Sequence, residues 1–392
     1  MKKAVVHLPS WFPCKTSALS GIFIRKQIEA LNSFDDYEHI VLIWHDTADT
    51  RLRSPFTFVT SFLNLLKKDE IWEENSVIYY KFHYFKTNEI YFGSNETRLF
   101  SRIKKIILKL QKQKKIELIH AHISFPAGFF AERLKRDLLI PYIISEHMSP
   151  FPFEHLVYDI QNTIISPVKN SGKIIAVSND HRNEIKRITG VDPIVIPNVV
   201  DEREFHLTES KKNTGSFRFL LIGLLKEQKG IDILLNAVKI IKDRNRRNFT
   251  VKIGGSGEIV NSLKLLIHDL KIENYIEWLG EVNREHICDI YADCDSFVSS
   301  SRHESFGVAI VEALACGKPV ISTRSGGPED IINETNGILV AKEDPIALAE
   351  GMEWMMDHIG KFEPSRIRED YLKKYSREVI ATAYLKVYNE II

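Results

Sequence analysis

Cysteine is scarce in this chain, which has only Cys14, Cys288, Cys294 and Cys316. The four residues form no Cys-x-x-Cys pair and no zinc-ligand spacing. The sequence therefore predicts no disulfide framework and no structural zinc site, and it favours a reducing cytoplasm. No run of eighteen apolar residues is present, so we expect no transmembrane helix. The apolar stretch at the start is too short for a signal peptide and predicts a first strand instead.

An excess of charge of one sign is also missing, since 53 Lys and Arg residues balance 52 Asp and Glu residues. The sequence pI is about 7.7, and no nucleic-acid-binding motif is present. We therefore expect no nucleic-acid partner. The chain also lacks a Gly-x-Ser-x-Gly nucleophile turn and a Walker phosphate loop, so neither chemistry is indicated.

The first half of the chain is nevertheless basic. Residues 1–198 hold 27 Lys and Arg against 21 Asp and Glu, a net charge of +6, whereas the remaining residues carry −5. Much of the excess lies in residues 101–115, where Ile103, Ile106, Ile107 and Leu110 recur at helical spacing. Such a basic amphipathic helix can pack on the core with its lysines in water. It can also lie on an anionic membrane surface, and both interpretations remain open.

The length and pattern of the chain predict two domains. Its 392 residues can bury two cores. Short apolar runs alternate with helical stretches twice, which predicts an α/β fold of two Rossmann-like domains with parallel sheets. The expected strands are residues 4–8, 39–44, 77–82, 118–120, 142–145, 174–177 and 194–196, then 217–222, 250–253, 276–278, 296–298, 319–322 and 337–340.

The boundary between the two domains is expected near residues 197–201, where a Pro-Asn pair ends a strand. This places the first domain at residues 1–198 and the second at residues 199–376. Residues 377–392 carry apolar side chains with a period of 3.6, which predicts a final amphipathic helix.

Two carboxylates, Glu304 and Glu312, bracket the segment E-S-F-G-V-A-I-V-E. Glu304 stands beside a Phe-Gly turn, and Glu312 lies in the apolar helix expected after it. A helix N-terminus favours anions and hydroxyl-rich ligands, so the first carboxylate can accept bonds from sugar hydroxyls and the second can hold a ribose diol. A solvated Glu beside a helix-capping Glu would have the same spacing. The pair is unlike a glycosidase dyad, which flanks the bond from opposite sides.

Seven segments of the second half, taken together, carry a family resemblance. They are FLLIGLLKEQKGIDILLNA from Phe219, IGGSGE from Ile253, WLGEV from Trp278, DSFVSSSRHESFG from Asp295, GKPVIST from Gly317, GGPEDI from Gly326 and NGILV from Asn336. In this order they resemble the carboxyl-terminal domain of the retaining glycosyltransferases of family 4, also called glycosyl transferases group 1, of the glycosyltransferase B superfamily. The first half is similar more loosely, through SGIFIRKQIEAL from Ser20, IHAH from Ile119, SEH from Ser145 and VIPNVVD from Val195.

The resemblance implies an enzyme with two Rossmann-like domains that face each other across a cleft, and a last helix that packs back on the first domain. The second domain would hold a nucleotide-sugar donor, either a UDP- or a GDP-sugar. The first would hold a saccharide or lipid-linked saccharide acceptor, as in surface polysaccharide or glycan biosynthesis. No cofactor and no obligatory metal are implied. We expect a cytoplasmic protein that can contact the inner face of the cell membrane loosely.

The resemblance also assigns the site. Glu304, His122 and Lys229 are the candidate catalytic residues: Glu304 would hold hydroxyls of the donor sugar, His122 would point toward that sugar, and Lys229 would reach the diphosphate. Glu312 would hold the ribose. The other donor-binding candidates are Gly21, Gly255, Gly280, Ser305, Phe306, Gly307 and Val308.

One position departs from the family pattern. The family usually has an Arg where this chain has Leu224. The donor pyrophosphate therefore has one cation fewer, which Lys226 can partly replace.

Other activities remain open at this point. A sugar phosphorylase or a nucleotide-sugar epimerase can use the same fold and site. His120 and His122 alternate on one strand and point to one face, as in a metal-dependent hydrolase, although the second half offers no matching His. Asp293 and Asp295 form an Asp-x-Asp pair, the metal and sugar-nucleotide signature of another glycosyltransferase superfamily. The pair precedes an apolar strand, so we interpret it as a helix end and a strand entry.

Overall fold

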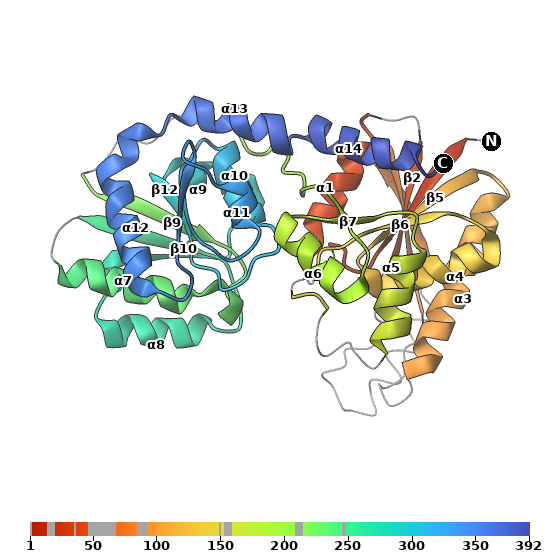
Figure 1. The fold of residues 1–392 in the computed structure, drawn as a ribbon, viewed down its shortest axis with the longest axis horizontal. Helices are drawn as coiled ribbons and strands as arrows, with labels where there is room; N and C mark the ends of the chain where they lie inside the picture. Colours follow the sequence, from red (N-terminus) through yellow and green to blue (C-terminus); the bar gives the residue numbers. More distant parts are fainter. Residues whose placement is uncertain are drawn as a thin grey trace.

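A computed structural model of the protein describes residues 2–13, 20–34, 37–45, 68–84, 92–148, 150–152, 159–207, 215–244 and 248–392. They form two α/β lobes that lie side by side, with both chain ends on the lobe that the chain enters first (Figure 1).

The first sheet has eight strands in the spatial order β3-β4-β2-β1-β5-β6-β7-β8. Its neighbours pair in parallel, except that the edge strand β3 runs antiparallel to β4. The strands are β1 (Lys3–Pro9), β2 (Glu38–His45), β3 (Glu70–Glu74), β4 (Val77–His83), β5 (Lys115–His122), β6 (Tyr142–Ser145), β7 (Ile174–Ala176) and β8 (Ile194–Val195).

The second sheet has six strands, all paired in parallel, in the order β11-β10-β9-β12-β13-β14. This is the strand order of the doubly wound nucleotide-binding fold. The strands are β9 (Phe217–Ile222), β10 (Phe249–Gly254), β11 (Ile276–Gly280), β12 (Ser296–Ser299), β13 (Val320–Thr323) and β14 (Gly337–Val340).

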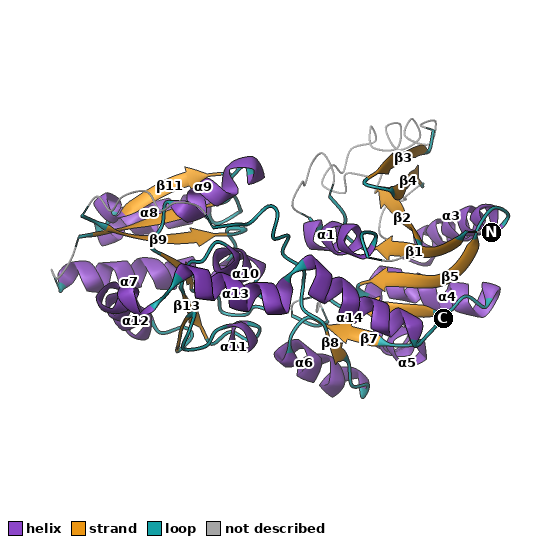
Figure 2. Ribbon diagram, turned by 90° about the horizontal axis from the view of Figure 1, so that it is seen from above, coloured by secondary structure: helices purple, strands orange, loops and turns teal. Residues whose placement is uncertain are grey.

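Helices cover both faces of each sheet, as Figure 2 shows from above. Those of the first lobe are α1 (Ile22–Leu31), α3 (Phe92–Gln111), α4 (Phe129–Leu138), α5 (Ser166–Asn170) and α6 (Asn179–Thr189). Those of the second are α7 (Ile231–Asp243), α8 (Val260–Leu270), α9 (Ile287–Ala292), α10 (Val308–Ala315), α11 (Pro328–Ile331) and α12 (Pro345–His358). Two further helices, α13 (Pro364–Tyr375) and α14 (Arg377–Asn389), run along the top of Figure 1 from the second lobe to the first.

Helix α14 completes the core of the first lobe. Alternate residues of β1 point to opposite faces of the sheet. On one face Val6 packs with residues of α3 and α4. On the other face Val5 packs with Ile380, Tyr384 and other apolar residues of α14. This second face of the first sheet is therefore covered by α14 together with α1, which contributes Ala30 and Leu31 to the same cluster.

Most predicted strands lie within a few residues of the observed ones, but two elements differ. β3 lies outside every predicted strand because all five of its residues are exposed at the sheet edge and show no apolar alternation. The helix predicted for residues 101–115 is α3, which begins at Phe92 and ends at Gln111. Lys115 instead opens β5. No described helix is both long and apolar enough to cross a membrane.

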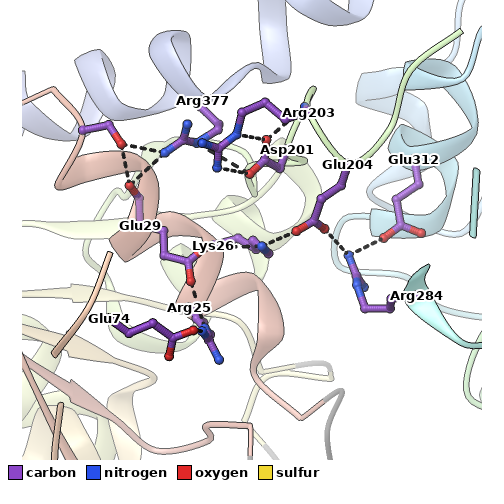
Figure 3. Close-up of polar contacts among 11 residues, drawn as sticks. Arg25, Lys26, Glu29, Glu74, Asp201, Arg203, Glu204, Arg284, Glu312 and Arg377 are labelled. Carbon is purple, nitrogen blue, oxygen red and sulfur yellow. Dashed lines mark hydrogen bonds and ion pairs between the residues drawn. The ribbon is translucent and has the colours of Figure 1, made fainter. Parts of the chain in front are cut away.

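Arg377, the first residue of α14, joins the two lobes (Figure 3). Its side chain is 9% exposed, and Nη2 donates hydrogen bonds to the Glu29 carbonyl oxygen at 3.0 Å and to Ser33 Oγ at 2.7 Å. Its Nε lies 3.7 Å from Oδ2 of the buried Asp201. Burial would raise the pKa of Asp201, but Arg203 and Arg377 outweigh it and hold that pKa below its usual value. One guanidinium thus ties α1 to the segment that links the lobes.

We predict that Arg377→Met lowers the free energy of unfolding by about 1.5 to 3 kcal/mol, because it removes the charged hydrogen bonds to the Glu29 carbonyl oxygen and to Ser33 and leaves Arg203 as the only cation paired with the buried Asp201 among the described residues. Urea denaturation followed by circular dichroism measures this change. The control is Arg182→Met, which removes an exposed pair with Asp192 and should cost at most about 1 kcal/mol. Equal losses in the two variants would contradict the role given to Arg377.

Candidate functional site

The candidate site lies where the order of the second sheet reverses. β9 and β12 are neighbours, but the strands that follow each of them in sequence lie on opposite sides of the pair. In open α/β sheets, ligands bind at the carboxyl ends of the strands beside such a switch point. The loop after β9 carries Lys229, and the loop after β12 carries Glu304.

Lys229 and Glu304 meet between these two loops. Lys229 Nζ lies 2.5 Å from Glu304 Oε2, and Ser301 Oγ donates to the same oxygen at 3.2 Å. Both charged side chains are partly exposed. The structure therefore places a paired cation and carboxylate, both open to solvent, at the switch point.

Glycine lets the two loops approach this closely. Gly230 follows Lys229 with φ +57°, and a Cβ at that position would lie 2.1 Å from the Ser300 carbonyl oxygen. Ser300 Oγ in turn donates to the Lys229 carbonyl oxygen at 2.9 Å. Any larger residue at Gly230 would force the β9 and β12 loops apart.

The segment after Glu304 turns into a helix. Glu304 forms an isolated parallel bridge to Gly326, Phe306 is buried, and Gly307 adopts φ +107° immediately before α10 begins at Val308. Helix N-termini leave backbone N–H groups without intrahelical partners, and these groups favour anions. Ser305, Phe306, Gly307 and Val308 therefore lie at the start of α10, where the sequence predicts backbone N–H groups that face the phosphates.

Glu312 lies on α10 and is 7% exposed. Tyr291 donates from its hydroxyl to Glu312 Oε2 at 3.0 Å, and Arg284 Nη2 lies 3.7 Å from Glu312 Oε1 (Figure 3). Burial raises the pKa of Glu312 to about 7, although Arg284 and the Tyr291 hydrogen bond oppose the rise. Among the described side chains, Glu304 and Glu312 share no bonding partner. The two carboxylates thus belong to separate groups of polar contacts.

The glycine candidates lie at strand ends and helix starts. Gly255 donates from its N–H to the Gly280 carbonyl oxygen at 2.7 Å, which joins the ends of β10 and β11. Gly255 has φ +135°, and a Cβ there would lie 1.9 Å from the Gly223 carbonyl oxygen. Gly21 opens α1 in the first lobe with φ +68°. Gly21, Gly255 and Gly280 each adopt a positive φ, which residues with a side chain rarely adopt.

His122, expected near the transferred sugar, is fully buried. Its Nε2 lies 3.1 Å from His7 Nδ1, and His7 Nε2 lies 2.8 Å from His39 Nδ1. His120 is hydrogen-bonded to Tyr388 at 2.7 Å and to Ser145 at 2.8 Å. The remaining nitrogen of His122, Nδ1, has no hydrogen-bond partner among the described residues.

Three of these imidazoles, His7, His120 and His122, lie close enough together to be considered as metal ligands. Their nitrogens mostly bond one another or neighbouring hydroxyls, and all three side chains are fully buried. A hydrolytic metal needs an open coordination position that substrate can reach. The cluster as it stands therefore fits a structural role better than a hydrolytic one.

The Asp-x-Asp pair lies away from the switch point. Asp293 follows the end of α9 and Asp295 precedes β12, as the sequence predicts. Arg218 bridges the two carboxylates at 2.6 and 3.2 Å, and Lys252 also reaches Asp293. Both carboxylates are therefore neutralised by cations of the protein itself.

Comparison with known proteins places these features in a family. Residues 202–378 match the family Glycosyl transferases group 1, and residues 56–204 match Glycosyltransferase Family 4. An uncharacterized glycosyltransferase of Methanocaldococcus jannaschii is 32% identical over 285 residues, which cover 70% of this chain and 76% of that protein. The chain belongs to glycosyltransferase family 4.

Two other similarities agree with this assignment. The putative teichuronic acid biosynthesis glycosyltransferase TuaC of Bacillus subtilis is 27% identical over 263 residues, covering 64% of each chain. The crystal structure of Anabaena Alr3699/HepE in complex with UDP and glucose superposes with a TM-score of 0.72 at 18% identity, covering 98% of this chain and 99% of that one. The family 4 protein therefore has the glycosyltransferase B fold.

Several residues of the site were not predicted from the sequence of this glycosyltransferase. Arg284 and Tyr291 contact Glu312, and Ser301 contacts Glu304. Ser301 lies within the motif DSFVSSSRHESFG, three residues before Glu304, so its position in the motif could have predicted a contact with that carboxylate. Arg284 opens a short 3-10 helix, Arg284–His286, in a polar segment where no sequence pattern distinguishes it from a solvated arginine.

Buried histidines predict acid sensitivity. Burial lowers the pKa of His7, His120 and His122 well below 6.5 and lowers that of His147 to about 3. These four histidines therefore stay neutral in the folded protein at pH values where the same side chains in the unfolded chain bind a proton. As pH falls below 6.5, each such histidine should cost about 1.4 kcal/mol of stability per pH unit.

Urea unfolding between pH 7.5 and 5 measures this dependence. His147→Leu should flatten the slope by one histidine's share, because it removes a histidine whose pKa burial lowers to about 3. Leu can take its place, since neither ring nitrogen of His147 has a hydrogen-bond partner among the described residues. His286→Leu, at a side chain that is 71% exposed, is the matched control for the loss of one histidine. A slope in His147→Leu equal to that of the wild type would show that His147 titrates normally in the fold.

Proposed function

We propose that this protein is a retaining glycosyltransferase that moves a sugar from a UDP- or GDP-sugar to a saccharide or lipid-linked saccharide acceptor. The observation that carries the proposal is the contact between Lys229 and Glu304 at the switch point of the second sheet. The Anabaena structure, which contains UDP and glucose, supports a nucleotide-sugar donor.

In this proposal Glu304 and Lys229 contact different parts of the donor. Glu304 accepts hydrogen bonds from hydroxyls of the donor sugar. Lys229 and the N–H groups of Phe306, Gly307 and Val308 face the diphosphate, where negative charge develops as the glycosidic bond breaks. Preorganised donors at that point stabilise the transition state more than the ground state.

Of the described residues, Lys229 is the cation that we propose to face the diphosphate, since Leu224 stands where the family usually has an Arg. The Leu224 side chain is 51% exposed, and Lys226 beside it is also exposed. We propose that Lys226 turns toward the diphosphate when the donor binds. No metal ion and no cofactor are needed in this scheme, because Lys229 and backbone N–H groups meet the phosphate charge.

Glu312 is proposed to hold the ribose of the nucleotide. Tyr291 bonds only Oε2 of this carboxylate, and Arg284 lies beyond hydrogen-bonding distance from Oε1. Oε1 can therefore accept a hydroxyl of a ribose diol. The acceptor would lie on the first lobe, on the side that carries Gly21 and His122.

An acceptor attached to a lipid would place the enzyme at a membrane. The described part of α3 buries Ile103, Ile106 and Ile107 in the core, which is the ordinary role of an amphipathic helix. Its outer face presents Lys105 and Lys109 around Leu108, which is 43% exposed. We propose a cytoplasmic protein that contacts an anionic membrane surface loosely through this face. The name of the Bacillus subtilis relative, a putative teichuronic acid biosynthesis glycosyltransferase, supports a role in polysaccharide biosynthesis.

For the donor site, we predict that Glu312→Ala weakens UDP or GDP binding by about 1 to 3 kcal/mol, because the ribose loses its acceptor. Glu304→Ala should lower turnover more than nucleotide affinity. Calorimetry measures the nucleotide affinity, and product analysis measures the turnover. Both are done with and without EDTA and with and without phosphate.

Unchanged nucleotide affinity in Glu312→Ala would refute the ribose assignment. Turnover lost in EDTA and restored by manganese would refute the metal-free scheme.

For the membrane, we predict binding to anionic phospholipid vesicles at low salt, with each lysine near the surface worth about 1 kcal/mol. Changing Lys104, Lys105, Lys109 and Lys112 to Gln should release the protein in a co-sedimentation assay. The control changes the same number of exposed lysines on the second lobe, Lys264, Lys342, Lys373 and Lys374, to Gln. Wild-type protein that stays in the supernatant at low salt would favour a soluble acceptor.

A further inference from the structure

Arg284 is held in a fixed position between two carboxylates that come from different parts of the chain (Figure 3). Its Nη2 lies 3.2 Å from Glu204 Oε2 and 3.7 Å from Glu312 Oε1. The guanidinium also lies 5.5 Å from the centre of the Phe205 ring, within the range of a cation–π contact. Glu204 is itself paired with Lys26 of α1. These contacts leave the guanidinium little freedom to swing away.

The unequal distances matter for what Arg284 can do. The shorter contact is a hydrogen bond to Glu204, whereas the separation of 3.7 Å from Glu312 is an ion pair without a hydrogen bond. Arg284 therefore supplies positive charge to Glu312 without occupying Oε1. A ligand hydroxyl can still use that oxygen.

Glu312 needs such a cation to stay ionised. Burial raises the pKa of Glu312 to about 7, and the neighbouring Glu204 and Cys288 add to the rise, whereas Arg284 and the hydrogen bond from Tyr291 favour the carboxylate. A protonated Glu312 has one acceptor oxygen fewer and competes as a donor for the hydroxyls of a diol.

The hydrogen bond donated by the Tyr291 hydroxyl depends on whether Glu312 is protonated. It lies 3.0 Å from Glu312 Oε2 and 3.2 Å from the Ala309 carbonyl oxygen, and its single proton can serve only one of them. It donates to Glu312 when that residue is ionised. It can donate to Ala309 when Glu312 is protonated, so the site accommodates both states without leaving a buried group unpaired.

We propose that Arg284 is a positioning residue for nucleotide binding, which keeps Glu312 an oriented carboxylate while Glu204 and Phe205 hold the guanidinium in place. The inference rests on the proposed role of Glu312 at the ribose. Arg284 touches neither the sugar nor the diphosphate in this scheme and acts through Glu312 alone.

The test is the pH dependence of UDP binding, or GDP binding if only GDP binds the wild type, by calorimetry from pH 6 to 9. Wild-type affinity should fall as pH decreases through about 7, because Glu312 takes up a proton. Arg284→Gln should move this loss about one pH unit higher, which corresponds to about a five-fold higher Kd at pH 7. At pH 9 the two proteins should bind nearly equally. Arg284→Lys should restore most of the wild-type profile.

Two controls separate this role from a merely structural one. Arg244 has the same exposed fraction as Arg284, 32%, and pairs with Glu353 elsewhere in the second lobe. Arg244→Gln should leave the pH profile unchanged. In a Glu312→Gln background, Arg284→Gln should have no further effect on Kd.

The outcomes distinguish the inference from the proposed function beneath it. If neither nucleotide binds the wild type, or if Glu312→Ala binds it as tightly, the ribose role fails and the inference fails with it. If Glu312→Ala weakens binding but Arg284→Gln matches the wild type, or weakens binding equally at every pH, Arg284 does not position Glu312. Only the inference is then overturned.

Discussion

Parallel pairing of strands is the constraint on which both lobes depend. Every connection between parallel neighbours must cross the sheet, so the carboxyl ends of the strands, and the loops that follow them, collect along one edge. In the second sheet the chain reverses its direction of winding between β9 and β12. The loops of these two strands therefore meet, and Lys229 and Glu304 form their contact there. The strand order therefore determines where these two side chains meet, whatever chemistry they perform there.

Alternating charge allows acidic groups to lie between the lobes. Glu312, Arg284, Glu204, Lys26 and Glu29 follow one another as carboxylate, cation, carboxylate, cation and carboxylate (Figure 3). Each carboxylate has a cation beside it, which offsets part of the cost of removing it from water. The chain of contacts runs from the proposed ribose site to the first helix of the other lobe.

The sequence predicted the strands better than it predicted the partners of the site. Strands such as β6 and β9 are buried on both faces and read as short apolar runs, whereas β3 is exposed at an edge and has no such pattern. Glu304 and Lys229 could be predicted because each stands in a motif with a characteristic neighbourhood.

Arg284 could not be predicted in the same way. It opens a short 3-10 helix, Arg284–His286, and its carboxylate partners come from α10 and from the interlobe segment. Only tertiary folding brings these groups together. The position of His122 illustrates the same limit: its alternation with His120 was visible in the sequence, but its contact with His7 arises from the pairing of β1 with β5. Sequence spacing reports faces and ends of elements, and long-range polar contacts lie beyond it.

The return of α14 to the first lobe has a consequence for how the protein is made. Domains generally fold in the order in which they leave the ribosome. Here one face of the first sheet, with Val5, Leu118 and Ile143, is covered by Ile380 and Tyr384, which are synthesised only after the whole second lobe. Until α14 has been synthesised, the apolar residues of the first sheet that pack against Ile380 and Tyr384 lack these partners, although Ala30 and Leu31 of α1 already lie beside them.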